Sequence, residues 1–329
     1  MSEKLIQFKD DVPIVLKSFK MTETKISEKL IILKIKDLPI PLNSFLSTQT
    51  KILINANYQK LADDNILSTL GIALAGCTSI SRISINLQSS KFKLKGVSSL
   101  VSSLAYCTNL TYLFLQLEQN SFNKSTLDFG SGFSNLSTLE LFIGKNYIDT
   151  ENYSRLHMSL AMCFKLTNLY LNIQDNFYYN IGNEKCNGLS SCINLQYLNL
   201  QFSTFTVNKS GLNREGNLYL ISSLRNLVKL QKFICNVKGE NDEEIASLLG
   251  SALISCISLE FLDISYRFEK NFEKSIAGFS SQLSNCSNLS SIKLDLRQSF
   301  KDEISYETTS ALSQNLAKCP KLTHLQLNI

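Results

Sequence analysis

Three residues near the middle of the chain, Asp128-Phe129-Gly130, have the order that holds magnesium beside ATP in protein kinases. In those enzymes the triplet follows a His-Arg-Asp loop, with a Gly-rich loop and a Val-Ala-Ile-Lys strand far upstream. The sequence contains none of these companions. It also contains no Walker loop and no dinucleotide-binding glycine fingerprint. The triplet therefore does not predict an ATP site.

Nine cysteines and two histidines are the other residues whose chemistry could form a site. No Cys-x-x-Cys pair occurs, and His157 and His324 are far apart in sequence, so the spacing does not favour zinc. Neither histidine has a patterned Ser, Cys or Asp near it, so no catalytic triad is indicated. The acidic run 242–244 precedes an expected helix, whose N-terminus negative charge stabilises. We therefore expect no enzyme, no metal site and no cofactor.

Seven of the cysteines instead mark a repeat of about 30 residues. The segment "LAYCTNLTYLFLQL", which starts at Leu104, shows the template L-x-x-C-x-x-L-x-x-L-x-L-x-L. Phe133 and Leu227 replace cysteine in two copies, which a metal ligand or nucleophile would not permit, so the column is predicted to be buried packing. Gly130 falls in a leucine column of the third copy, so the triplet is part of the repeat. The nine copies are anchored at residues 77, 107, 133, 163, 192, 227, 256, 286 and 319.

Each copy has a helical half and a strand half. Apolar residues at helical spacing, such as Ile245, Leu249 and Leu253, predict one buried helix face. Alternation around Leu113 and Leu115 then predicts a strand buried on one face. Asparagines 109, 135, 194 and 288 are expected in the joining turns, because Asn tolerates the left-handed conformation. Since one unit cannot bury its apolar side alone, we predict an α/β fold: a right-handed solenoid, or horseshoe, of about nine helix-strand repeats with a parallel sheet on the concave face.

At these columns the chain resembles the leucine-rich repeat family, in particular the long-repeat, helix-bearing subtype of ribonuclease inhibitor-like proteins. The resemblance covers roughly residues 60 to 329. It implies the horseshoe and a concave contact surface. The family has Asn or Cys directly after the strand, whereas this chain has other residues there. This departure predicts a longer strand in place of the family's asparagine ladder. The matching positions here are Gln88, Glu118, Gly144, Gln174, Ser203, Lys238, Arg267 and Arg297.

The ends of the chain fit the repeat less well. We expect residues 1–60 to form an atypical N-terminal capping region and residues 61–329 to form one continuous solenoid domain. The segments "KLIILKIKDL" and "TKILINANY" predict two strands, with inward positions at Leu30, Leu33, Ile35, Ile52 and Ile54. The sequence stops at an inward strand position, 329, so we expect either a truncated chain or another surface over that edge.

Composition and charge exclude several classes of protein. With 44% hydrophobic and 19% charged residues, the chain can bury a large core. Its formal charge of +5 is spread along the sequence without a basic run, which argues against nucleic acid or anionic membrane as the partner. The N-terminus lacks the apolar core of a signal peptide, and no apolar stretch reaches about 18 residues, so we expect no membrane insertion and a cytoplasmic location.

The outward strand residues form the remaining candidate surface. Exposed aromatic rings beside polar groups are typical of protein interfaces, because large rigid rings bury area at little entropy cost. Aromatic residues also suit strands for packing reasons alone. We predict a protein-binding surface on the concave sheet that consists of Tyr112, Phe114, Phe142, Tyr170, Tyr197, Phe261, Asp263 and Lys293.

The expected function is a non-enzymatic protein–protein interaction scaffold that binds a protein partner on its concave sheet. An alternative is the recognition or regulatory portion of a larger enzyme, such as a protein kinase, whose catalytic domain is absent from these 329 residues; the ending at Ile329 motivates it. A third reading is RNA binding through the basic residues of the C-terminal repeat units. This reading predicts an affinity that falls steeply as the salt concentration rises. The sequence does not identify the partner or the oligomeric state.

Overall fold

The computed structural model describes residues 30–34, 50–55, 64–120, 122, 133–179, 187–203, 212–238, 243–267, 273–296 and 305–328. The Asp128-Phe129-Gly130 triplet and Cys186 lie outside these residues, as does the predicted domain boundary at residue 60. That boundary stays a prediction.

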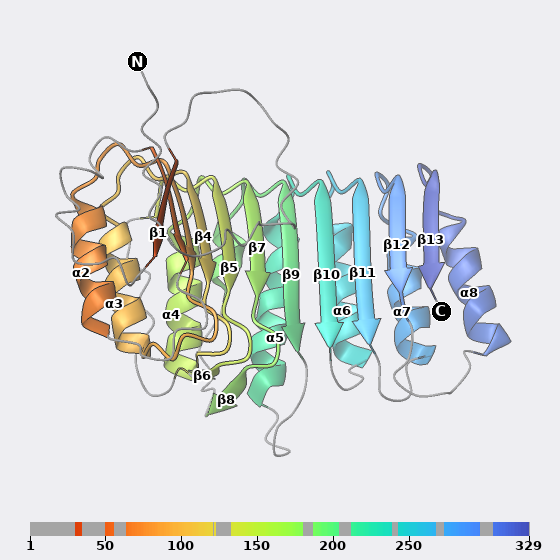
Figure 1. The fold of residues 1–329 in the computed structure, drawn as a ribbon. Helices are drawn as coiled ribbons and strands as arrows, with labels where there is room; N and C mark the ends of the chain where they lie inside the picture. The colour runs from red at the N-terminus through yellow and green to blue at the C-terminus, as the bar shows by residue number, and fades with distance from the viewer. Residues whose placement is uncertain are drawn as a thin grey trace.

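Strands and helical segments alternate along most of the chain (Figure 1). The strands are β1 (Leu30–Lys34), β2 (Lys51–Asn55), β3 (Arg82–Asn86), β4 (Tyr112–Gln116), β5 (Thr138–Phe142), β6 (Tyr147–Asp149), β7 (Asn168–Asn172), β8 (Phe177–Tyr179), β9 (Tyr197–Ser203), β10 (Lys232–Lys238), β11 (Phe261–Arg267), β12 (Ser291–Asp295) and β13 (His324–Asn328). The helical segments are α2 (Asp64–Ala75), α3 (Leu94–Leu104), α4 (Thr150–Ala161), η2 (Gly188–Ser191), α5 (Leu212–Ser222), η4 (Ser223–Asn226), α6 (Glu243–Ile254), α7 (Glu273–Leu283) and α8 (Tyr306–Leu316).

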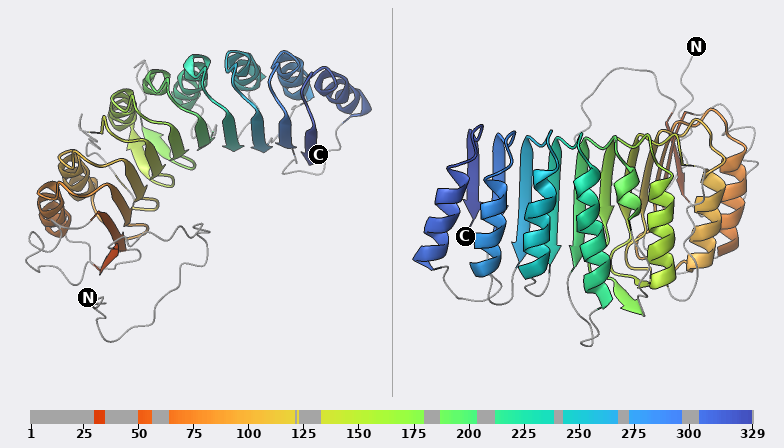
Figure 2. Two further views of the ribbon diagram at one scale, coloured as in Figure 1. Left: turned by 90° about the horizontal axis from the view of Figure 1, so that it is seen from above. Right: turned by 180° about the vertical axis from the view of Figure 1, so that it is seen from behind.

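One parallel sheet runs the length of the molecule. Its 11 strands follow chain order, β1-β2-β3-β4-β5-β7-β9-β10-β11-β12-β13. The path from strand to helix to next strand winds in a right-handed sense (Figure 1). Seen from above, the molecule is an arc with the sheet on its inner side and the helices on its outer side (Figure 2). The predicted α/β solenoid with a concave parallel sheet is therefore confirmed.

The nine predicted units correspond to strands β3 to β13 of this sheet. β1 and β2 lie where strands were predicted, and they extend the sheet on its N-terminal side. β2 buries Ile52 and Ile54, as predicted. The pairing aligns Leu33 with Ile54 and Leu30 with Lys51. The structure does not describe the side chains of the predicted inward positions in and after β1, so that prediction stays a prediction. A short second sheet, β6 with β8, was not predicted and lies in the connecting segments.

The cysteine column is buried in the core. The seven cysteines of the column are buried free thiols, as is Cys235 on β10, and Phe133 and Leu227 occupy the column in the other two units, 3% and 0% exposed. The thiols also bridge neighbouring units. The Cys107 thiol donates to the backbone oxygen of Leu74 at 3.3 Å. The thiols of Cys192, Cys256 and Cys319 donate in the same way to Leu160, Leu224 and Leu283 of the preceding unit. Each thiol thus satisfies a carbonyl in the last turn of a helical segment.

The turn asparagines adopt a role that differs from the predicted one. None of the four has a positive φ, so tolerance of the left-handed conformation does not explain them. Each side-chain amide instead donates to a backbone oxygen in the turn of the preceding unit. The pairs are Asn109 with Thr78 (2.7 Å), Asn135 with Thr108 (2.8 Å), Asn194 with Phe164 (2.9 Å) and Asn288 with Ile257 (2.5 Å).

The structure contains an asparagine ladder, so its predicted absence was wrong. The ladder lies two residues beyond the family position, at Asn120, Asn146 and Asn176. The backbone N–H of Asn120 donates to Asn146 Oδ1, and that of Asn146 donates to Asn176 Oδ1, both at 2.8 Å. The Asn146 amide also donates to the backbone oxygens of Leu117 and Ile143, at 3.0 and 2.9 Å. The displacement arises because each strand half carries one more inward residue, such as Leu117, before the turn.

Strand length changes where the ladder stops. Ser90, Asn120, Asn146 and Asn176 follow five-residue strands, and the residue before each has a φ between 53° and 60°. This left-handed residue turns the chain so that the next side chain points into the core. After Asn176, strands β9, β10 and β11 each extend to seven residues. The predicted longer strand is therefore confirmed for these three strands and wrong for the ladder units.

The asparagine ladder predicts an unequal effect of two similar substitutions. Asn146→Ala should lower the free energy of unfolding by about 3 kcal/mol, because several buried backbone groups lose their partner. Asn135→Ala removes an exposed amide that makes the same kind of contact in the turn and should cost about 1 kcal/mol. Urea denaturation of both variants measures the difference. Equal losses would contradict the ladder.

Candidate protein-binding surface

Three aromatic rings meet on the concave face, and we call Phe114, Phe142 and Tyr170 the aromatic cluster. They come from β4, β5 and β7, which are neighbours in the sheet. The ring centroids of Phe114 and Phe142 are 5.4 Å apart, and those of Phe142 and Tyr170 are 4.6 Å apart in a stacked arrangement. All three side chains are half-buried. Their mutual contact fixes the rings while leaving part of each one open to solvent.

Tyr112 adjoins this cluster through a polar contact. Its hydroxyl donates to Glu140 Oε1 at 2.9 Å, and the Arg82 guanidinium lies 4.5 Å from its ring centroid. Burial is the main cause that raises the pKa of Tyr112, and the Glu140 carboxylate adds to it. Glu140 lies between Phe114 and Tyr170 in the strand register. The predicted surface included Tyr112, and it did not include Glu140, which lies between the rings.

Two other predicted rings form a separate group. The Lys232 ammonium lies 4.5 Å from the Phe261 centroid and 5.6 Å from the Tyr197 centroid. Tyr197 was predicted to belong to the same surface as the aromatic cluster. Its cross-strand neighbours are instead Asn168 on one side and Lys232 on the other. The structure thus places Tyr197 with the later units.

Asp263 and Lys293 pair with each other on the same face. Lys293 Nζ lies 3.1 Å from Asp263 Oδ2, and the two side chains are 40% and 19% exposed. A partly exposed pair of this kind contributes little to stability. The two residues present one positive and one negative group at adjacent positions of β12 and β11.

Asn199 occupies the middle of the concave face with an unsatisfied acceptor. It pairs in register with Tyr170 on β7 and Ile234 on β10, and it is 8% exposed. Within the described part of the chain, its Oδ1 atom has no hydrogen-bond partner. A buried acceptor without a donor costs about 1 to 3 kcal/mol.

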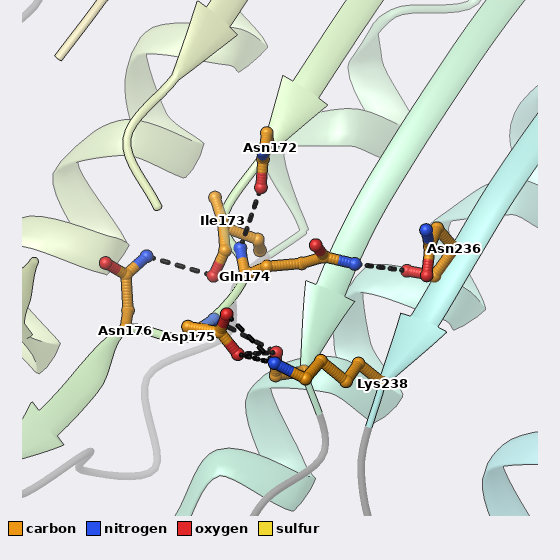
Figure 3. Close-up of polar contacts among 8 residues, drawn as sticks. Asn172, Ile173, Gln174, Asp175, Asn176, Asn236 and Lys238 are labelled. Atoms are coloured by element: carbon orange, nitrogen blue, oxygen red, sulfur yellow. Dashed lines mark hydrogen bonds and ion pairs between the residues drawn. The ribbon is translucent and has the colours of Figure 1, made fainter. Parts of the chain in front are cut away.

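A polar cluster braces the lower ends of β7, β9 and β10 (Figure 3). Lys238 Nζ lies 3.0 Å from Asp175 Oδ1, and the Asp175 backbone N–H donates to Ser203 Oγ at 3.0 Å. The Gln174 amide donates to the backbone oxygen of Asn236 at 3.2 Å. Both Lys238 and Asn236 belong to β10, so these contacts cross β9 and join units that are not neighbours. The cluster marks the place where the ladder stops, and the sequence prediction missed it.

A half-buried carboxylate lies beside the aromatic cluster. Glu118 accepts hydrogen bonds from Gln116 Nε2 at 2.7 Å and from Asn172 Nδ2 at 2.9 Å. Burial raises the pKa of the Glu118 carboxyl. Gly144 lies between these groups, where a Cβ atom would come within 3.3 Å of Glu118 Oε1 and 2.7 Å of the Gln174 backbone oxygen. The glycine gap allows Glu118 and Asn172 to meet across β5.

The two histidines form no site together. His157 lies on α4 and is 2% exposed, with its ring edge-on to Tyr153 at 4.7 Å. A Cβ atom on Gly188 would overlap the His157 backbone oxygen, so the next unit packs directly against this part of α4. His324 is exposed at the start of β13. Among the described residues, no group of three His, Cys, Asp or Glu side chains could hold a metal ion. None of the described helices is long and apolar enough to cross a membrane.

A group of exposed large apolar side chains in the units from β7 to β11 lies outside the concave face. Met162, Phe164, Ile193, Val228 and Ile257 all flank the cysteine column in the helix-to-strand turns. The sequence prediction missed them, because it examined the outward strand residues alone. The signal was present in the aligned copies, where four consecutive units have an apolar residue directly after the anchor position.

The buried histidine predicts a specific pH dependence of stability. Burial lowers the pKa of His157 from 6.5 to about 4, so the folded protein holds it neutral. The unfolded chain binds a proton as the pH falls below 6.5, whereas the folded chain resists it until about pH 4. Stability contributed by His157 is therefore present above pH 6.5 and is lost toward pH 4, by roughly 3 kcal/mol.

Urea denaturation at pH 7 and pH 4.5 measures this effect. His157→Gln should reduce the loss of stability on acidification, whereas His324→Gln should leave it unchanged. An acid sensitivity that is the same in wild type and His157→Gln would show that His157 is not buried as described.

Comparison with known proteins finds solved structures that are similar to the chain at low sequence identity. No family model matches the sequence, and no curated protein does. Internalin C2 from Listeria monocytogenes is similar at 18% identity with a TM-score of 0.38, over 71% of this chain and 84% of that chain. An internalin, inlF, from the same species is 15% identical with a TM-score of 0.36, over 89% and 86% of the two chains. The mouse RP105/MD-1 complex gives 18% identity and a TM-score of 0.40, over 87% of this chain and 49% of that chain. The chain's own repeat columns, parallel sheet and asparagine ladder give it the architecture of a leucine-rich-repeat solenoid.

Proposed function

We propose that the chain is a non-enzymatic protein–protein interaction scaffold that binds a protein partner on its concave sheet. The observation that carries this proposal is the aromatic cluster, three rings held in mutual contact on that face. Concave sheets of solenoids offer extended binding surfaces. Rings that are already ordered lose little conformational entropy when a partner covers them. More of the free energy gained by burying them therefore contributes to the affinity.

The groups around the cluster fit a protein partner. Tyr112 and Glu140 supply a hydrogen-bonded polar edge, and Glu118 supplies an acidic edge. Asn199 supplies a buried acceptor that a backbone N–H of a partner can satisfy after a small movement of its side chain. Apolar rings at the centre with polar groups at the rim are the usual anatomy of protein interfaces.

The later units supply the second part of the proposed surface. Tyr197 and Phe261 pack on either side of Lys232, which holds a cation between two rings. Asp263 and Lys293 form the rim next to them. Lys293, one of the basic groups of the later units, is paired with Asp263, and Lys238 is paired with Asp175, so both charges are largely compensated. These pairs favour a protein partner over an RNA.

A cytoplasmic location is part of the proposal. Support comes from the eight described cysteines, which are buried free thiols. Reduced thiols are typical of the cytosol, where disulfides are rare.

The aromatic surface predicts a loss of binding without a loss of folding. Tyr112, Phe114 and Tyr170 changed together to Ser should reduce capture of the main partner from native extract by about tenfold or more, because each ring is a potential hot spot. Quantitative affinity purification measures the capture, and thermal denaturation checks the fold.

A matched control removes exposed apolar side chains elsewhere. Ile72, Met158 and Tyr306, which are 71%, 67% and 83% exposed on α2, α4 and α8, are changed together to Ser and should leave capture intact. Full capture by the concave variant would overturn the proposal. Binding to RNA that falls steeply with salt, and that the concave variant retains, would point instead to a nucleic-acid partner.

A further inference from the structure

A row of exposed apolar side chains follows one edge of the solenoid, and we call it the apolar ridge. The row lies in the helix-to-strand turns, along the upper edge in Figure 1. Each member directly follows an anchor of the cysteine column, in four consecutive units. The members are Phe164 (49% exposed), Ile193 (53%), Val228 (43%) and Ile257 (63%).

The repeat architecture forces these side chains into line. Each anchor is buried in the core, and the turns of Phe164 and Ile257 are tied to the next unit by an asparagine amide. Asn194 Nδ2 donates to the Phe164 backbone oxygen at 2.9 Å, and Asn288 Nδ2 donates to that of Ile257 at 2.5 Å. Neighbouring strands are about 4.8 Å apart, so ridge side chains recur at intervals of about 5 Å or slightly more.

The ridge is confined to the units from β7 to β11. In earlier units the same column holds the polar residues Thr78, Thr108 and Ser134, and in the next unit it holds Ser287. Met162, 44% exposed, lies on the other side of the first ridge anchor and widens that end. Contiguous exposed apolar side chains with polar borders mark interaction sites. The position is an outer edge, so the ridge is separate from the concave aromatic cluster.

Positive charge flanks the ridge. Lys165 and Lys229 directly follow Phe164 and Val228, and both lysines are exposed. Their ammonium groups donate to neutral amide oxygens, Lys165 to Asn135 Oδ1 and Lys229 to Asn194 Oδ1, each at 2.7 Å. These contacts hold the lysines over the turn of the preceding unit, beside the ridge. Their charges are positioned but not neutralised by these partners.

We propose that the apolar ridge binds an amphipathic helix of another protein that carries acidic residues along one flank of its apolar stripe. Apolar positions three and four residues apart on a helix are neighbours at about 5 to 6 Å, which matches the interval between the solenoid units. The straight row accepts one stripe, and Lys165 and Lys229 pair with Glu or Asp beside it. Lys165 and Lys229 attract acidic side chains, and the regular interval of the ridge matches the stripe of a helix, so charge and spacing together favour this partner.

Fluorescence anisotropy with designed peptides tests the proposal on the whole chain. The probe is a labelled helix of about 18 residues with Leu at positions i, i+3 or i+4, and i+7, and with Glu along one flank. A second peptide has Lys in place of each Glu. The Glu-flanked peptide should bind at least about tenfold more tightly than the Lys-flanked peptide, because its attractive pairs with Lys165 and Lys229 become repulsive in the Lys-flanked peptide.

Variants locate the binding to the ridge. Ile193→Asp combined with Ile257→Asp should abolish binding of the Glu-flanked peptide, whereas Thr108→Asp, in the same column outside the ridge, should have no effect. Lys165→Glu combined with Lys229→Glu should reverse the preference between the two peptides. All of these side chains are exposed, so the melting temperatures should stay close to that of wild type.

Several outcomes would overturn the proposal. They are no binding of the Glu-flanked peptide, equal affinity for both peptides, or binding that survives the ridge substitutions. Ridge-dependent binding to phosphatidylserine vesicles without peptide preference would assign the ridge to a membrane surface. Self-association in sedimentation that the ridge substitutions remove would assign it to a second copy of this chain. The concave triple variant should bind the peptide normally, because the two surfaces are separate.

Discussion

Contact between identical columns of neighbouring units is the constraint on which the rest of the structure depends. One helix-strand unit cannot bury its apolar face, so each unit must present the same inward residues to the next. The strand register shows this alignment, since Leu139 pairs with Leu113 on one side and Leu169 on the other. Thiols, turn asparagines and the ladder asparagines then hydrogen-bond backbone groups of the adjacent unit.

The alignment of the buried columns also determines how the surface residues are arranged. An outward position in one unit lies beside the same position in the next, so surface features form rows rather than isolated points. Phe114, Phe142 and Tyr170 build a row of rings on the concave face. Phe164, Ile193, Val228 and Ile257 build a row of apolar side chains on the turn edge. Neither row contributes to the core, and the two rows face different directions, which suits a scaffold with two partners.

The columns made most of the fold predictable from the sequence. Nine aligned copies show which positions are apolar, and the described ones are buried in the units from β3 to β12, including Phe133 and Leu227 in the cysteine column. In the last strand, at the edge of the sheet, Leu325 is 48% exposed. The ladder was missed because the family spacing was applied without the extra inward residue, although Asn120, Asn146 and Asn176 all follow that residue by three positions. Contacts that skip a unit, such as Asp175 with Lys238, depend on a small residue in the strand between them and leave no repeated pattern. The grouping of the aromatic rings depends on cross-strand neighbours such as Glu140. Aligning the columns gives the position of each residue, but it does not show which neighbouring side chains make contact.

Thiol labelling of the native protein tests the central claim most directly. The native chain is treated with iodoacetamide, and each cysteine is quantified by mass spectrometry against a urea-unfolded reference. Stacked units that enclose the cysteine column predict that Cys77, Cys107, Cys163, Cys192, Cys235, Cys256, Cys286 and Cys319 react far more slowly in the folded protein than in urea, because burial hides the thiols and raises their pKa. Rapid native labelling across the column, at rates close to those in urea, would contradict the stacked solenoid and with it both proposed surfaces.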